Sequence, residues 1–341
     1  MHAHHDAVPS AHRRHIDQIG DAVAAIWCAS TAIRPTMRVV ADLEFPDFYM
    51  VGAPKCGTSA MYSFLRQHPD VFMPRKKEIL FFGSDLSYAT RPTRAEYLRY
   101  FSDTAGRERV GTAHTAYLQS ARAASEIKAV RPDADIIVML RNPVDVIPAW
   151  HSELLYQAVE DTADLSEALD AEPERRSGQR LPPHVANSYV ESLFYSDVGR
   201  FSEQVSRYYA IFGREHVHVI LYDDFSEDPR LVYRRTLEFL KVRADFEPVM
   251  AVVNANKRAR SARLQALMFH SEGQLRRLGR LAIPRNIRSA LIRLNTSVEP
   301  RVETPRPVRR QLLSLFEEDI VRLGDLVDRD LTHWLTLDEP G

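Results

Sequence analysis

Short apolar runs alternate with helix-like stretches through the middle of the chain. Residues 48–51, 136–140 and 216–221 are rich in Val, Ile, Leu and aromatic side chains, which is typical of buried strands. A turn and a helical stretch follow the first two runs, over 59–66 and from Val144 onward. This alternation predicts βαβ units, and therefore a three-layer α/β fold with a central parallel sheet flanked by helices.

The segments outside these units are predicted to be mainly helical. We expect one long helix over 187–212 before the third strand, and a mostly helical remainder from about residue 228. Residues 1–45 are predicted to form a helical or flexible N-terminal extension, and 46–341 a single domain. Because the apolar stretch 22–28 is short and preceded by Asp17 and Asp21, we interpret it as part of an amphipathic helix, not as a signal peptide.

Composition narrows the class of protein. The 341 residues are 45% hydrophobic and 27% charged, as in ordinary globular proteins, and the formal net charge is −1. This balance gives no reason to expect a nucleic-acid partner, and no apolar run approaches the ~18 residues that span a bilayer. Two cysteines, Cys28 and Cys56, cannot build a disulfide framework, so we expect a cytoplasmic protein. They form no zinc-ligand spacing either, and we expect no metal.

The segment after the first predicted strand carries the strongest chemical pattern. Residues 51–59 read VGAPKCGTS, a strand that turns through small residues into a helix. The unpaired backbone N–H groups at such a helix start, together with the helix dipole, form an anion site. Lys55 adds a charge there, and Thr58 and Ser59 add hydroxyl donors.

The order of residues separates this loop from a nucleoside-triphosphate loop. In the latter, GxxxxGK[ST], the lysine follows the last glycine and a hydroxyl holds magnesium. Here Lys55 precedes Gly57, and the second strand ends in 140-LRNP-143 without a magnesium-binding Asp. The loop therefore looks built for a phosphate without a metal. A magnesium-dependent P-loop kinase and a non-catalytic anion-binding module remain as alternatives.

Taken together, the motifs resemble those of the sulfotransferases that use 3′-phosphoadenosine 5′-phosphosulfate (PAPS). The loop 54-PKCGTS-59 is similar to the family's PKxGT[ST], and 77-KEILFF-82 to its KExxFF segment. The segments 140-LRNPVD-145, 222-YDDFSEDP-229 and 330-DLTHW-334 resemble later family motifs in the same order. The ordered set of these motifs indicates a transferase of this family.

The resemblance implies roles for particular residues. Lys55 would stabilise the bridging oxygen of PAPS during sulfuryl transfer to a hydroxyl or, less favourably, an amine. The product of the donor would be adenosine 3′,5′-bisphosphate (PAP). Arg141 would hold the 3′-phosphate with its donor fork. The 5′-phosphate would be held by the loop, made of Pro54, Lys55, Cys56, Gly57, Thr58 and Ser59.

Two residues compete as the general base. Glu78 matches the position that serves as base in glycan-modifying members of the family. His114 is the rival, because an imidazole titrates near neutrality and other branches of the family use a histidine base. An ion pair with Lys76 or Lys77 is the structural alternative for Glu78. The sequence does not decide between Glu78 and His114.

Several positions depart from the family pattern or add to it weakly. Ala149 stands where the family usually has a serine on the 3′-phosphate, and Ser152, about one helical turn later, could replace it. Tyr195 could stack on adenine, although an aromatic there is more often part of the core. A late basic loop resembles one that closes over the 3′-phosphate, with Lys257, Arg258 and Arg260 as its candidate contacts. The acceptor, a small molecule, lipid or glycan, and the oligomeric state cannot be read.

Overall fold

The computed structural model describes residues 44–104, 106–185, 188–250, 257–261, 264–265, 285–298 and 303–337. All of them belong to one compact unit, 44–341. The expected extension over 1–45 lies almost entirely outside the described residues and stays a prediction.

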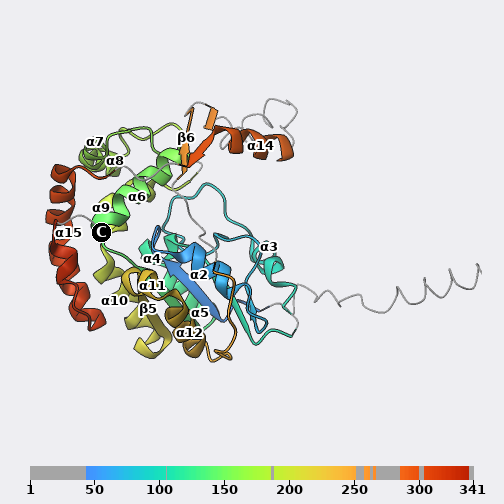
Figure 1. Cartoon of the computed structure of the whole chain (residues 1–341). Helices are drawn as coiled ribbons and strands as arrows, with labels where there is room; N and C mark the ends of the chain where they lie inside the picture. The colour runs from blue at the N-terminus through green and yellow to red at the C-terminus, as the bar shows by residue number, and fades with distance from the viewer. Residues whose placement is uncertain are drawn as a thin grey trace, which may run out of the picture. The chain divides into compact units, whose positions relative to one another are not determined.

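A five-stranded parallel sheet forms the centre of this unit (Figure 1). The strand order is β2-β3-β1-β4-β5. The expected parallel sheet is therefore confirmed. The predicted strands appear as β1, β4 and β5, and the short β2 and β3 extend one side of the sheet. The bounds are β1 Phe48–Gly52, β2 Val71–Phe72, β3 Arg109–Ala113, β4 Asp135–Leu140 and β5 Val217–Leu221.

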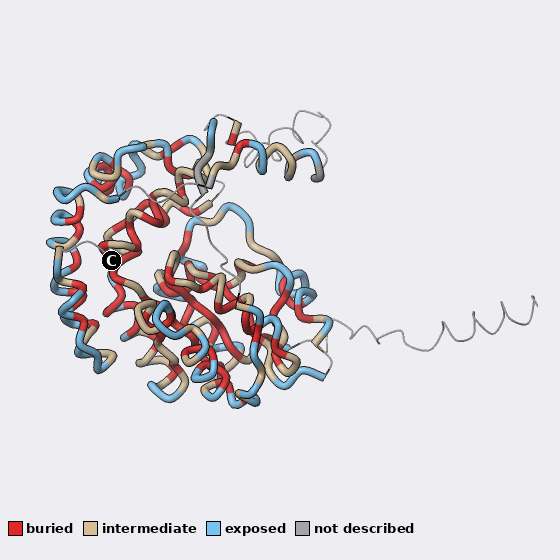
Figure 2. The backbone as a smooth tube through the Cα atoms, in the orientation of Figure 1, coloured by how far each residue is buried: buried red, intermediate tan, exposed pale blue. Residues whose placement is uncertain are grey.

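The central strands are buried on both faces, which explains their continuous apolar runs. Every residue of β1 and β4 is buried, including Asp135, and Figure 2 shows these strands in red at the middle of the molecule. Phe48 is in register with Gly111 of β3 and Asp135 of β4. A Cβ on Gly111 would lie 2.0 Å from the Phe48 ring, so only glycine fits beneath that side chain.

Two groups of helices flank the sheet. Aromatic side chains pack α2 against α11 and α12, since the ring centroid of Phe64 lies 6.2 Å from the ring centroids of both Phe225 and Tyr233. On α10, the Tyr208 hydroxyl donates to the Tyr117 carbonyl of α4 at 2.9 Å. The helices are α2 Thr58–Leu65, α3 Arg94–Leu98, α4 Ala116–Gln119, α5 Ala123–Val130, α6 Pro143–Tyr156, α7 Leu165–Asp170, α8 Glu172–Arg176, α9 Tyr195–Val198, α10 Phe201–Phe212, α11 Tyr222–Glu227, α12 Pro229–Phe239, α14 Arg285–Asn295 and α15 Arg306–Val327.

The prediction of one long helix over 187–212 was wrong. The chain instead forms a 3₁₀ turn, η4 Val190–Leu193, then α9 and α10. Gly199 separates the two helices, and a Cβ there would lie 2.5 Å from the Phe316 ring of α15. Close packing against α15 (Figure 1) thus interrupts a segment whose apolar spacing is helical throughout.

Most of the described residues after 228 are helical, as expected. A small antiparallel pair joins β6 Lys257–Ala259 to β7 Thr296–Val298. Further 3₁₀ turns are η2 Arg99–Phe101, η5 Arg214–His216 and η6 Thr332–Leu335.

Candidate active site

A cavity of about 1440 Å³ opens at the carboxyl ends of the strands. Each of four strands contributes a lining residue just after its end: Lys55 after β1, His114 after β3, Arg141 after β4 and Tyr222 after β5. Ligands of open α/β sheets bind at this edge, because loops and helix N-termini converge there. The topology therefore brings together residues that are far apart in the sequence.

The loop between β1 and α2 forms one side of the cavity. Gly57 caps α2 with a left-handed backbone, φ +85°, and a Cβ there would lie 3.1 Å from the Phe225 ring, so this turn requires glycine. Pro54, Gly57, Thr58 and Ser59 all line the cavity, as Lys55 does. The backbone donors at the start of α2 thus face the space where an anion would bind.

Cys56 has a different place from its neighbours. Its side chain is fully buried, and Sγ donates to the Pro54 carbonyl at 3.3 Å. Burial raises the pKa of the thiol to about 12. Cys56 is therefore a protonated packing residue beneath the loop, and its side chain does not reach the cavity.

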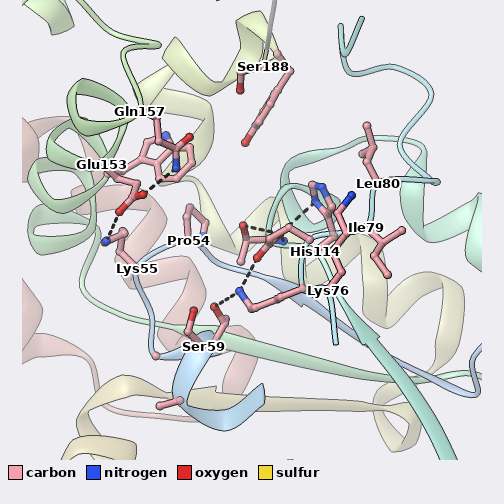
Figure 3. Close-up of a pocket in the computed structure, with 18 of the residues that line it drawn as sticks. Pro54, Lys55, Ser59, Lys76, Ile79, Leu80, His114, Glu153, Gln157 and Ser188 are labelled. Atoms are coloured by element: carbon pink, nitrogen blue, oxygen red, sulfur yellow. Dashed lines mark hydrogen bonds and ion pairs between the residues drawn. The ribbon is translucent and has the colours of Figure 1, made fainter. Parts of the chain in front are cut away.

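Lys55 points across the loop to helix α6 (Figure 3). Its Nζ lies 3.0 Å from Oε2 of Glu153, whose Oε1 accepts from Gln157 Nε2 at 2.8 Å. Lys55, Glu153 and Gln157 all line the cavity. The cation of the loop is thus paired in the structure with a carboxylate three turns along α6.

A second lysine touches both the loop and the candidate base. Lys77 Nζ donates to Thr58 Oγ1 at 3.3 Å and to a carboxylate oxygen of Glu78. The other oxygen of Glu78 accepts from the Thr115 backbone N–H at 2.8 Å and lies 3.6 Å from Nδ1 of His114. The ion pair considered as the structural alternative for Glu78 exists, but the pair itself lines the cavity.

The pKa values of the two candidate bases are shifted by different causes. Burial alone would raise the pKa of Glu78, but Lys77, the His114 imidazole and the Thr115 N–H outweigh burial and lower it. For His114, burial lowers the pKa to about 4, against the opposing charge of Glu78. At neutral pH the site therefore holds an ionised Glu78 beside a neutral His114.

Arg141 lies at the cavity where α6 begins. Its guanidinium stacks over the Tyr222 ring, 4.7 Å from the centroid, and lies 3.7 Å from Asp145. Asn142 caps α6 by accepting from the Val144 N–H at 3.0 Å, and Pro143 occupies the first turn, as the sequence predicts. This cap fixes the direction of the chain that carries Arg141.

The other predicted donor contacts are not among the described residues that line the cavity. Ser152 is half-buried on α6 and is not among the described residues that line the cavity. Tyr195 is fully buried, and its hydroxyl donates to Glu160 at 2.7 Å, so it lies in the core and not against the cavity. Lys257 and Arg258 belong to β6, and their side chains lie outside the described residues. Arg260 is exposed, and its N–H donates to the Asn295 carbonyl at 2.8 Å.

Sequence reasoning missed several residues of the cavity. Trp150, Glu153 and Gln157 recur at helical spacing on one face of α6, and this periodicity could have placed them beside Arg141. Tyr88 and Tyr189 come from distant segments, and their rings stack with centroids 4.4 Å apart. No sequence pattern joins those two positions.

None of the described helices is long and apolar enough to cross a membrane. The same part of the chain contains no cluster of three or more His, Cys, Asp or Glu with the geometry of a metal site.

Comparison with known proteins places the chain in a family. Residues 45–263 match the sulfotransferase domain family. A crystal structure of a sulfotransferase from Alicyclobacillus acidocaldarius superposes with a TM-score of 0.65 at 29% identity, covering 86% of this chain and 100% of that one. The chain therefore belongs to the sulfotransferase domain family, a family of transferases with this P-loop-like fold.

Two curated relatives are more distant. One is the membrane-associated sulfotransferase kil1 of Dictyostelium discoideum, 20% identical over 59% of this chain and 57% of the relative. The other is the bifunctional heparan sulfate N-deacetylase/N-sulfotransferase 1 of Caenorhabditis briggsae, 23% identical over 59% of this chain and 23% of the relative. The alignments thus span less than two thirds of either relative.

Proposed function

We propose that this protein transfers the sulfuryl group of PAPS to a hydroxyl group, or less favourably an amine, of a small-molecule, lipid or glycan acceptor. The observation that carries this proposal is the convergence of Lys55, Lys77, Thr58 and Glu78 on one cavity at the ends of the strands. Membership in the sulfotransferase family supports the type of reaction.

The charge of the cavity suits an anionic donor. Its described lining contains six cations and three carboxylates, namely Lys55, Lys76, Lys77, Arg91, Arg99 and Arg141 against Glu78, Glu96 and Glu153. Backbone N–H groups at the start of α2 add further donors. A group bearing two phosphates and a sulfate fits this set.

The residues divide the work of an in-line transfer. The bond between sulfur and the phosphate oxygen breaks while a bond between sulfur and the acceptor oxygen forms. Lys55 and the loop of Gly57, Thr58 and Ser59 stabilise the negative charge on the departing 5′-phosphate. Arg141 binds the 3′-phosphate with its planar donor fork.

Glu78 is the better of the two candidate bases. The Ala116 N–H donates to Nδ1 of His114 at 3.3 Å, so the neutral ring carries its proton on Nε2. In this tautomer the imidazole has no free lone pair with which to accept another proton. Glu78 is ionised at neutral pH and takes the acceptor proton, while Lys77 and the Thr115 N–H orient its carboxylate.

Titration calorimetry with PAP, ADP and Mg-ATP tests the donor site. We expect PAP to bind without magnesium and at least tenfold more tightly than ADP, because only PAP presents a 3′-phosphate to Arg141. Lys55→Ala should weaken PAP binding and reduce transfer from ³⁵S-labelled PAPS by about 100- to 1000-fold. A preference for Mg-ATP would instead indicate a kinase, and binding of PAP without transfer to any acceptor would indicate an anion-binding module.

A further inference from the structure

The cation of the donor loop is already neutralised by a carboxylate. Lys55 Nζ and Glu153 Oε2 are 3.0 Å apart, and the two side chains are only 24% and 29% exposed. Both residues line the cavity (Figure 3). A carboxylate beside the lysine repels an anionic ligand and competes with it for the same ammonium group.

Glu153 is held in the orientation that makes this contact. Its two oxygens have different partners, because Gln157 Nε2 donates to Oε1 at 2.8 Å while Lys55 takes Oε2. Gln157 lies one turn further along the same helix, so the carboxylate cannot rotate without losing one of the two bonds. Lys55 itself has a left-handed backbone, φ +62°, at the tip of the loop.

The other cations nearest to the loop are paired differently. Lys77 contacts Thr58 of the loop as well as its own acidic neighbour, Glu78. Arg141 lies 3.7 Å from Asp145, but Asp145 also accepts from Arg309 at 2.9 Å and is thus shared between two guanidinium groups. Glu153 is therefore the carboxylate whose charge acts most directly on the loop lysine.

We propose that Glu153 is a positioning residue that holds Lys55 on α6 in the ligand-free protein and releases it when the donor binds. This inference rests on the proposed function, since it assumes that an anionic donor occupies the loop. On binding, the Lys55 ammonium exchanges Glu153 for the phosphate oxygen, and on product release it returns. Glu153 thereby weakens the binding of donor and product alike and assists the departure of PAP.

Glu153→Gln is the direct test, because the amide keeps the size of the side chain and removes only its charge. We expect calorimetry with PAP to show binding about fivefold tighter than in the wild type, the scale of a partly exposed ion pair. The KM for PAPS should fall by a similar factor. Glu318→Gln is the matched control, since it removes a carboxylate from an exposed i,i+4 pair with Arg322 on α15 and should leave PAP binding unchanged.

A double-mutant cycle separates the ion pair from a general effect of charge. In a Lys55→Met background, Glu153→Gln should tighten PAP binding much less, because the competition for the ammonium is gone and only the direct repulsion between the carboxylate and PAP is relieved. Equal affinities of wild type and Glu153→Gln would overturn the inference and leave the donor site intact. Tightening by the same factor in Lys55→Met would overturn it as well. If neither the wild type nor Glu153→Gln binds PAP, the proposed function fails together with the inference.

Discussion

Two clusters of acid and base in this protein use similar side chains in opposite ways. In the core, Glu160 pairs with Arg175 at 2.7 and 2.8 Å through both oxygens, and it also accepts from the Tyr195 hydroxyl at 2.7 Å. At the cavity, Glu78 pairs with Lys77 and lies beside His114. Each cluster contains an ionised carboxylate that accepts hydrogen bonds from its neighbours, but only the cluster of Glu78 adjoins an open space.

The degree of enclosure separates them. The side chains of Glu160 and Arg175 are 0% and 1% exposed, whereas that of Glu78 is 37% exposed and lines the cavity. Glu78 also has a left-handed backbone, φ +59°, a conformation that an ordinary residue adopts at a cost. A perturbed carboxylate indicates a reactive site only where a ligand can reach it. The buried cluster, by contrast, joins the segment after α6 to α8 and α9.

The largest expected effect is on turnover at the cavity cluster. Glu78→Gln should reduce sulfuryl transfer by about 100- to 10,000-fold, since it removes the proton acceptor and preserves the size of the side chain. The measurement is transfer from ³⁵S-labelled PAPS to a panel of hydroxylated acceptors. His114→Asn should have the smaller effect, and a larger loss in that variant would make His114 the base.

The next effect is on stability at the core cluster. Arg175→Met should lower the free energy of unfolding by about 3–5 kcal/mol, because it leaves Glu160 charged and unpaired in the interior. Urea denaturation measures this loss, and PAP affinity of the folded protein should not change. The matched control is Arg322→Met, which breaks an exposed pair with Glu318 and should cost less than ~1 kcal/mol. Equal losses of stability in Arg175→Met and Arg322→Met would contradict the special cost of breaking the buried pair.

The smallest effect is a shift in titration between the two groups at the cavity. By NMR, the His114 ring should titrate at about 4, well below its ordinary 6.5, because burial disfavours the imidazolium. The charge of Glu78 opposes that shift, so Glu78→Gln should lower the pKa of His114 further. A midpoint near 6.5 in the wild type would contradict the buried, neutral imidazole on which the choice of base rests.

Local patterns in the sequence were sufficient to predict the loop between β1 and α2 and the start of α6. The turn at Gly57, the lysine before it and the Pro143 start of the next helix are all encoded within a few residues. The structure places Lys55, Glu78, His114 and Arg141 around one cavity, as the ordered motifs predict. Helical spacing also predicted that 187–212 would be one helix, but packing of Gly199 against Phe316 is not visible in that spacing.

Tertiary structure decided which similar residues have which role. Tyr195 and Glu78 were both candidates by position, and only the fold shows that Tyr195 bonds a buried carboxylate while Glu78 faces the cavity. The pairing of Lys55 with Glu153 joins residues 98 positions apart, and the strand order alone brings their helix and loop together. The sequence determined the family, the parallel sheet and the turn before α2, because the patterns that mark them lie within short stretches of the chain. Burial and long-range pairing belong to the assembled fold, because they depend on elements that meet only when the chain has folded.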